Sequence, residues 1–175
     1  STASISVCLP KKSSIIENQN TVVWYKNPKA TKYIVEFQDM TEEPIFKTET
    51  TDTSLTFDYA SFKLKLDNTI MVSVKGVTSS GELTSENYVL QFLKEAKNAE
   101  LYQDKEMLKS EYKEETALNY LMKASFYNQY NLFLDAKKCY ESAIRLEPTI
   151  KEYKIAYMNF LTSKNLLDFY PYEKK

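Results

Sequence analysis

The sequence predicts an α+β protein with two segregated domains: an all-β sandwich at residues 1–90 and an all-α helical domain at residues 91–175. Two observations carry this prediction. In the first half, apolar residues alternate with period two between turn signals, and no helical segment lies between the runs to make crossovers. After Phe92 there is no glycine, and no proline before Pro148, while apolar residues recur at helical intervals.

The first domain is expected to contain seven short strands. Lys32–Gln38 alternates most clearly, because Tyr33, Val35 and Phe37 fall on one face of the run. Turn signals recur about every 8–12 residues, a spacing that favours an antiparallel sandwich. The polar stretch 11–20 is interpreted as a loop. The expected strands are 4–9, 21–25, 32–38, 44–49, 54–59, 69–77 and 88–92.

Several short motifs in this half stand in a familiar order. Trp24 lies in the second expected strand and Tyr33 begins the third. The stretch 66–77, which includes Leu66 and Asp67, precedes a turn into the last strand at 80–86. This order resembles a fibronectin type III or related immunoglobulin-like domain, with Trp24 as the family's core tryptophan. The family's corner tyrosine is absent, since Ile70 stands near its place.

The helical half contains one well-marked hairpin at residues 117–148, with expected helices at about 115–130 and 135–146. Asn131 stands at the turn, where asparagine tolerates the left-handed conformation. Pro148 closes the second helix. The order of small and aromatic residues resembles one tetratricopeptide repeat, the two-helix unit of interaction scaffolds. Lys123 departs from this pattern, because a leucine is usual there.

One such repeat cannot bury its apolar face alone, and roughly three repeats are usual for stability. The flanking helices, the sandwich or another chain must therefore cover it. Residues 93–112 are expected to form one helix, or two helices broken near Asp104. Residues 149–163 form either the first helix of an incomplete repeat or a terminal cap. The tail at 169–172 either docks on its own domain, inserts into a partner or is disordered.

The composition excludes several classes of chemistry. The chain has no histidine, two cysteines, two glycines and a net charge of −1. A histidine base, a clustered zinc site and a glycine-rich phosphate loop are therefore not available. No basic block marks a nucleic-acid surface, and no apolar run reaches the roughly 18 residues of a transmembrane segment. We expect no catalytic residue, no metal and no cofactor.

Two kinds of residue are weak candidates for catalysis. The acidic pairs Glu42-Glu43 and Glu114-Glu115 have the composition of an acid and base pair, but a solvated turn and a helix start explain them more simply. Cys139 has no histidine to activate it, so a structural thiol is the simpler interpretation.

The aromatic residues Phe46, Phe57, Tyr59 and Phe62 either line a carbohydrate platform or pack in the core.

The tetratricopeptide resemblance implies a partner-binding face on the first helix of the hairpin. The basic clamp that some members use for a carboxylate terminus is missing, because Leu121 and Met122 stand at two of its positions. The face therefore implies an apolar peptide or helix as partner. Alternatively, the two leucines pack against the preceding helix. The candidate partner-binding residues are Leu118, Leu121, Ser125, Asn128 and Gln129.

The leading expectation is a non-enzymatic scaffold that holds another protein, with the sandwich as a spacer or second contact. The alternative is a surface accessory module in which the sandwich binds a carbohydrate or a receptor. A sandwich followed by a helical hairpin is similar in layout to some bacterial envelope proteins. That layout favours the periplasm or cell surface and leaves the cytoplasm open. A homo-oligomer is possible, and Ser1 is either a processed or an engineered terminus.

Overall fold

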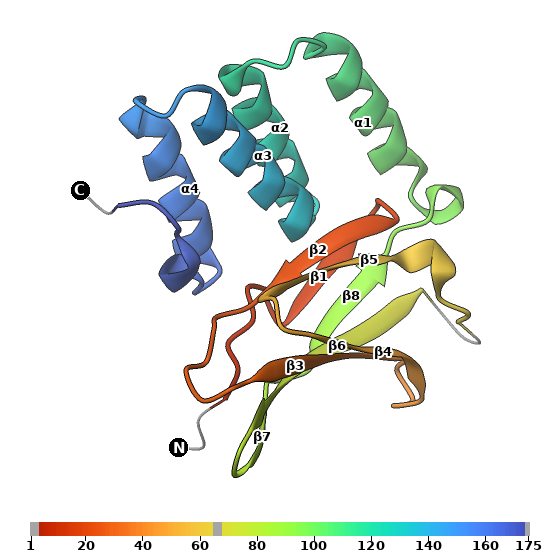
Figure 1. Cartoon of the computed structure of the whole chain (residues 1–175). Coiled ribbons are helices and arrows are strands. Elements are labelled where there is room, and N and C mark those ends of the chain that lie inside the picture. Colours follow the sequence, from red (N-terminus) through yellow and green to blue (C-terminus); the bar gives the residue numbers. More distant parts are fainter. Residues whose placement is uncertain (1–3, 65–67, 174–175) are drawn as a thin grey trace. The chain divides into compact units, whose positions relative to one another are not determined.

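The computed structural model describes residues 4–64 and 68–173 of the chain, and Figure 1 shows its elements. The chain divides between Phe92 and Leu93 into two compact units, which we call the β unit and the helical unit. Strands occupy the first and α-helices the second. This order confirms the predicted fold class, a β-sandwich followed by helical hairpins.

The described part of the β unit contains eight strands in two sheets. The larger sheet has the order β1-β8-β6-β3-β4, with β7 also paired to β6, and the smaller sheet pairs β2 with β5. The strands are β1 (Lys12–Ile15), β2 (Gln19–Val23), β3 (Lys32–Gln38), β4 (Pro44–Thr50), β5 (Ser54–Asp58), β6 (Thr69–Thr78), β7 (Gly81–Thr84) and β8 (Tyr88–Phe92).

Aromatic and branched side chains join the two sheets into a sandwich. The ring centroids of Phe37 on β3 and Phe57 on β5 lie 4.8 Å apart, so the larger and smaller sheets pack face to face. Trp24, which is 2% exposed, follows β2 and meets the edge of Tyr33 at 5.5 Å. The central strands supply fully buried residues, as the alternating pattern predicts: Val35, Phe37, Ile70, Val72, Val74 and Leu90.

The start of the chain differs from the sequence prediction. The polar stretch that was expected to be a loop contains β1, while the expected strand at 4–9 makes only an isolated bridge between Val7 and Trp24. Ser13 and Ser14 of β1 are buried, and serine is small enough to fill such positions. Because Ser13 and Ser14 are polar, the sequence pattern did not indicate this strand, although both residues are buried.

Two further details of the sandwich differ from the prediction. β1 pairs with β8 in the parallel direction, whereas the strand spacing had favoured antiparallel pairing. The turn after β6 returns at once as β7, a strand that the sequence interpretation did not separate from the turn. Leu66 and Asp67, which belong to the proposed family motif, lie outside the described residues.

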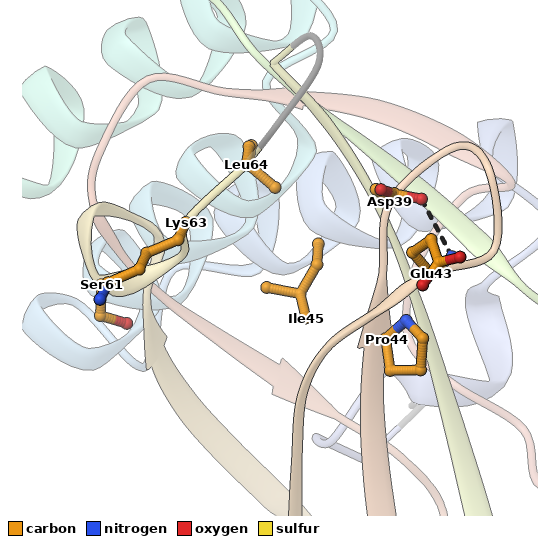
Figure 2. Close-up of a pocket in the computed structure, with 7 residues that line it drawn as sticks. All are labelled: Asp39, Glu43, Pro44, Ile45, Ser61, Lys63 and Leu64. Atoms are coloured by element: carbon orange, nitrogen blue, oxygen red, sulfur yellow. Dashed lines mark hydrogen bonds between the residues drawn. The ribbon is translucent and has the colours of Figure 1, made fainter.

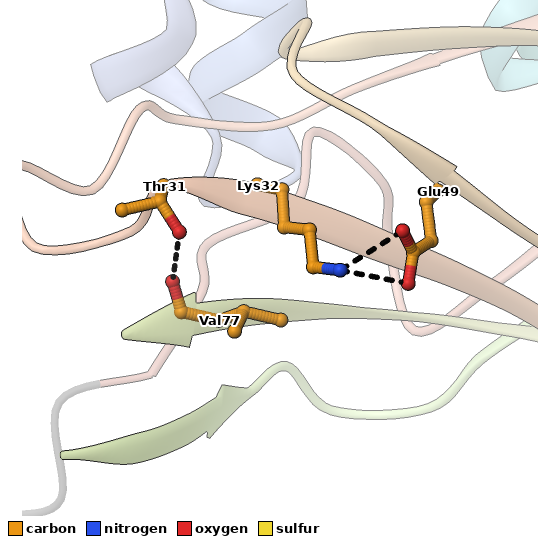
Figure 3. Close-up of polar contacts among 4 residues, drawn as sticks. All are labelled: Thr31, Lys32, Glu49 and Val77. Carbon is orange, nitrogen blue, oxygen red and sulfur yellow. Dashed lines mark hydrogen bonds and ion pairs between the residues drawn. The ribbon is translucent and has the colours of Figure 1, made fainter. Parts of the chain in front are cut away.

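The solvent side of β3 and β4 carries polar contacts (Figure 3). The Lys32 ammonium donates to both carboxylate oxygens of Glu49, at 3.0 and 2.9 Å, and the Thr31 hydroxyl donates to the Val77 carbonyl at 3.3 Å. Both charged groups are exposed, so their pairing contributes at most about 1 kcal/mol. The Lys32–Glu49 pair therefore lies on a solvent-exposed side of β3 and β4.

The helical unit consists of α1 (Ala99–Glu111), α2 (Ala117–Gln129), α3 (Phe133–Leu146) and α4 (Lys151–Ser163). The Thr116 hydroxyl caps α2 by accepting from the Asn119 amide at 3.2 Å. Asn131 adopts φ 58°, the left-handed turn conformation that the sequence predicts. Ala124, Ala136 and Ala143 are fully buried, so small residues allow α2 and α3 to approach closely.

The flanking segments resolve alternatives that the sequence left open. α1 continues through Asp104 without a break, after a short 3-10 helix at Glu95–Lys97. α3 begins at Phe133, two residues before the predicted start. The tail docks on its own unit, because the Tyr170 ring packs against Tyr157 with centroids 5.9 Å apart and is 6% exposed. Figure 1 shows this tail returning beside α4.

Candidate functional site

The predicted partner-binding face lies on α2. Leu118 is 57% exposed, Ser125 and Gln129 are also exposed, and Leu121 and Asn128 are half-buried. The buried residues of the helix are Ala117 and Ala124, which lie beside the half-buried Leu121 and Asn128 at helical spacing. Five candidate side chains therefore lie along one side of one helix and reach solvent. Their role in binding a partner stays a prediction.

α1 meets the last part of this helix. The Tyr130 hydroxyl donates to the Asp104 carboxylate at 2.8 Å, and Tyr130, Phe126 and Gln129 line a small cleft with α1. Leu118, near the start of α2, is not among the cleft residues and is largely exposed. Packing against the preceding helix therefore does not account for Leu118.

A further apolar residue extends the exposed face. Met122 is 43% exposed and lies one helical turn after Leu118. The sequence interpretation named Met122 only as a residue that replaces part of a basic clamp. Its spacing from Leu118 was the available signal. Leu118 and Met122 together give the first half of α2 an exposed apolar character.

Within the acidic pair Glu42-Glu43, Glu43 lines a cavity of about 240 Å³ in the β unit, near Asp39 (Figure 2). One carboxylate oxygen of Asp39 accepts from the Thr41 amide at 2.8 Å, the Thr41 hydroxyl at 2.7 Å and the Glu43 amide at 3.0 Å. Glu42 adopts φ 66° at the tip of this turn. These hydrogen bonds to Asp39 stabilise the turn that leads into β4.

The aromatic residues considered as a carbohydrate platform contact one another as a cluster around Phe62. Phe62 stacks on Phe57 with centroids 5.9 Å apart and meets Tyr59 at 6.3 Å. Phe57 and Tyr59 are buried, and Phe46 is 45% exposed. Packing therefore occupies most of these rings, and Phe46 alone among the four presents a largely exposed side chain.

Cys139 is a buried free thiol on α3. Burial, with a smaller contribution from the Asp135 charge, raises the pKa of Cys139 from 9.0 to about 12. The thiolate is the reactive form of cysteine, so this environment suppresses nucleophilic chemistry. Cys8 is buried as well, and the two thiols do not form a disulfide.

We expect native Cys139 to react with iodoacetamide at pH 8 at least about a hundredfold more slowly than in the unfolded chain, because the native thiol is protonated and buried. A Cys8→Ala variant isolates the Cys139 signal, and mass spectrometry with and without urea measures the two rates. Equal rates would contradict the structural role assigned to this thiol.

Comparisons with solved structures find similarity over about half of the chain. An Fn3-like protein from Clostridium thermocellum is 19% identical and covers 49% of this chain and 95% of its own, with a TM-score of 0.32. The fn3 domain of human collagen alpha-1(XX) chain is 14% identical and covers 54% and 90%, with a TM-score of 0.38. The FN5 domain of Drosophila Lar is 19% identical and covers 49% and 99%, with a TM-score of 0.35. No family model and no curated protein matches the chain.

The described residues offer neither a membrane-spanning helix nor a metal-binding cluster. Among these residues, no helix combines the length and the apolar character that crossing a bilayer requires. Within the same part of the chain, no group of three or more acidic or cysteine side chains is placed to hold a metal ion.

Proposed function

We propose that this protein is a non-enzymatic binding module, in which α2 of a tetratricopeptide-like hairpin recognises another protein. The observation that carries the proposal is the exposed apolar start of α2, where Leu118 and Met122 reach solvent. Exposed apolar residues that cluster on one face are typical of interaction sites.

The chemistry of the face indicates the kind of partner. Leu118, Leu121 and Met122 supply apolar contacts at one end, and Ser125, Asn128 and Gln129 supply hydroxyl and amide groups at the other. None of these six side chains is charged. The partner is therefore an uncharged segment, whose apolar side chains contact the leucines and whose polar groups hydrogen-bond to the amides.

The β unit serves as a rigid spacer or second contact in this proposal. The layout, a sandwich followed by helical hairpins, supports a place in the periplasm or on the cell surface. A second copy of the chain is one form that the partner can take.

The test compares two matched charge substitutions. Leu118→Glu on α2 is expected to abolish capture of the partner from the source cells, because a carboxylate in an apolar contact loses its hydration. Ile155→Glu on α4 is the control, since Ile155 is 49% exposed and also apolar. The control is expected to capture the same protein as the original chain, measured by quantitative mass spectrometry.

A crosslinking experiment locates the contact. A photo-reactive amino acid at the exposed position 125 is expected to crosslink to an apolar segment of the captured protein. Capture that survives Leu118→Glu, or that is lost equally in Ile155→Glu, would contradict the proposal. The half-buried Leu121→Glu variant is expected to behave as Leu118→Glu does.

A further inference from the structure

A different side of the helical unit holds a cavity of about 500 Å³, which we call the basic pocket. Five of its residues lie on α3, and four of these five recur at intervals of three and four, so they share one face of that helix. The chain's only arginine, Arg145, is among them. The lining residues are Lys138, Glu141, Ser142, Ile144, Arg145, Pro148, Lys154 and Tyr172.

The charges of this pocket are unbalanced. It has three cations, Lys138, Arg145 and Lys154, and one acid, Glu141. Glu141 is already engaged, because the Lys137 ammonium lies 2.8 Å from it and the Tyr157 hydroxyl donates to it at 2.8 Å. Across residues 4–64 and 68–173, the three pocket cations make no ion pair or hydrogen bond with one another or with any other residue. Their charge is therefore available to a ligand.

The remaining wall of the pocket is apolar and well supported. Ile144 is 1% exposed and forms part of the floor. Tyr172 comes from the docked tail and is held by the rings of Tyr157 and Tyr170, with centroids 6.4 and 5.3 Å away. Pro148 completes this side. The folded tail thus contributes an aromatic surface beside the three cations.

We propose that the basic pocket binds a small organic phosphate monoester. The phosphate lies among Lys138, Arg145 and Lys154, whose excess charge matches a dianion, and the planar guanidinium can hold two of its oxygens. The organic body lies on Ile144, Pro148 and Tyr172. A cavity of this size falls in the range of small-molecule sites. This site is separate from the α2 face and does not depend on the proposed function.

The test is a calorimetric titration of the full chain with phenyl phosphate at low ionic strength. Saturable one-to-one binding is expected. Arg145→Gln and Lys154→Gln are each expected to weaken it about tenfold, as for the loss of one charge-assisted hydrogen bond. Lys151→Gln is the matched control, because Lys151 is an exposed lysine of α4 outside the pocket. It is expected to bind as the original chain does.

A second variant tests the apolar wall. Tyr172→Ala keeps all three cations, so it is expected to weaken phenyl phosphate several-fold while leaving inorganic phosphate unchanged. Three results would overturn the proposal: equal affinity for inorganic phosphate and phenyl phosphate, tighter binding of benzoate than of phenyl phosphate, or equal weakening by Lys151→Gln. Circular dichroism of each variant confirms that the helices remain folded.

Discussion

Replacing Trp24 with alanine is expected to lower the free energy of unfolding of the β unit by about 3 to 5 kcal/mol, the range for deleting a large buried aromatic ring. Trp24 is among the largest fully buried side chains, and its ring meets Tyr33 edge-on. Tyr33 in turn accepts a hydrogen bond from the Asn27 amide at 2.8 Å. Losing the indole leaves a cavity at the junction of β2, β3 and the segment around Val7. Urea unfolding followed by far-ultraviolet circular dichroism measures the change.

Trp24→Phe is the control for this prediction. The indole nitrogen of Trp24 has no hydrogen-bond partner in the described part of the chain, so phenylalanine loses no polar contact. Trp24→Phe keeps an aromatic ring against Tyr33. It is expected to lower the free energy of unfolding by less than half as much as Trp24→Ala does. A loss below about 1 kcal/mol for the alanine variant would contradict the central place of Trp24, because cavities of this size cost more.

Replacing Tyr157 with alanine is expected to destabilise the helical unit by a similar amount, about 3 to 5 kcal/mol. Tyr157 is fully buried on α4. Its ring stacks on Tyr140 of α3 at 5.6 Å and contacts Tyr170 of the tail at 5.9 Å. The variant therefore removes the side chain that joins α3, α4 and the tail, and the helical signal in circular dichroism during urea unfolding reports the loss.

Tyr157→Phe separates the ring from its hydroxyl. Phenylalanine keeps the stacking and loses the hydrogen bond to Glu141, which the Lys137 ammonium still contacts. The free energy of unfolding of this variant is expected to fall by about 1.5 to 3 kcal/mol, the usual contribution of one hydrogen bond to a charged group. If Tyr157→Phe cost as much as Tyr157→Ala, the stacking would not be the source of stability.

Strands could be predicted from the sequence where their buried side chains are apolar, and were missed where the buried side chains are polar. The bounds of β3 were predicted correctly, because Tyr33, Val35 and Phe37 recur at every second position of Lys32–Gln38 and form one apolar face. β1 was missed, because its buried Ser13 and Ser14 are polar in the sequence. Parallel pairing of β1 with β8 joins segments far apart in the chain, and local alternation carries no information about such a partner.

The helical hairpin was predictable from its small residues, since Ala124, Ala136 and Ala143 mark the close crossing of α2 and α3. The basic pocket was not predictable in the same way. Lys138 and Arg145 read as ordinary surface charges, and only the return of the tail places Tyr172 beside them. The sequence left the position of that tail open among three alternatives.

The parallel pairing of β1 with β8 also bears on how the β unit forms during synthesis. Lys12 pairs with Val89 and Ile15 with Phe92. The backbone groups of β1 can therefore form these hydrogen bonds only after β8 has been synthesised. Such distant pairings slow folding, because a long loop must close before any contact rewards it. On a ribosome, a nascent chain shorter than about residue 92 therefore exposes the edge of β6 that β8 later covers. The β unit is expected to complete its sheet only after the start of the helical unit has begun to emerge.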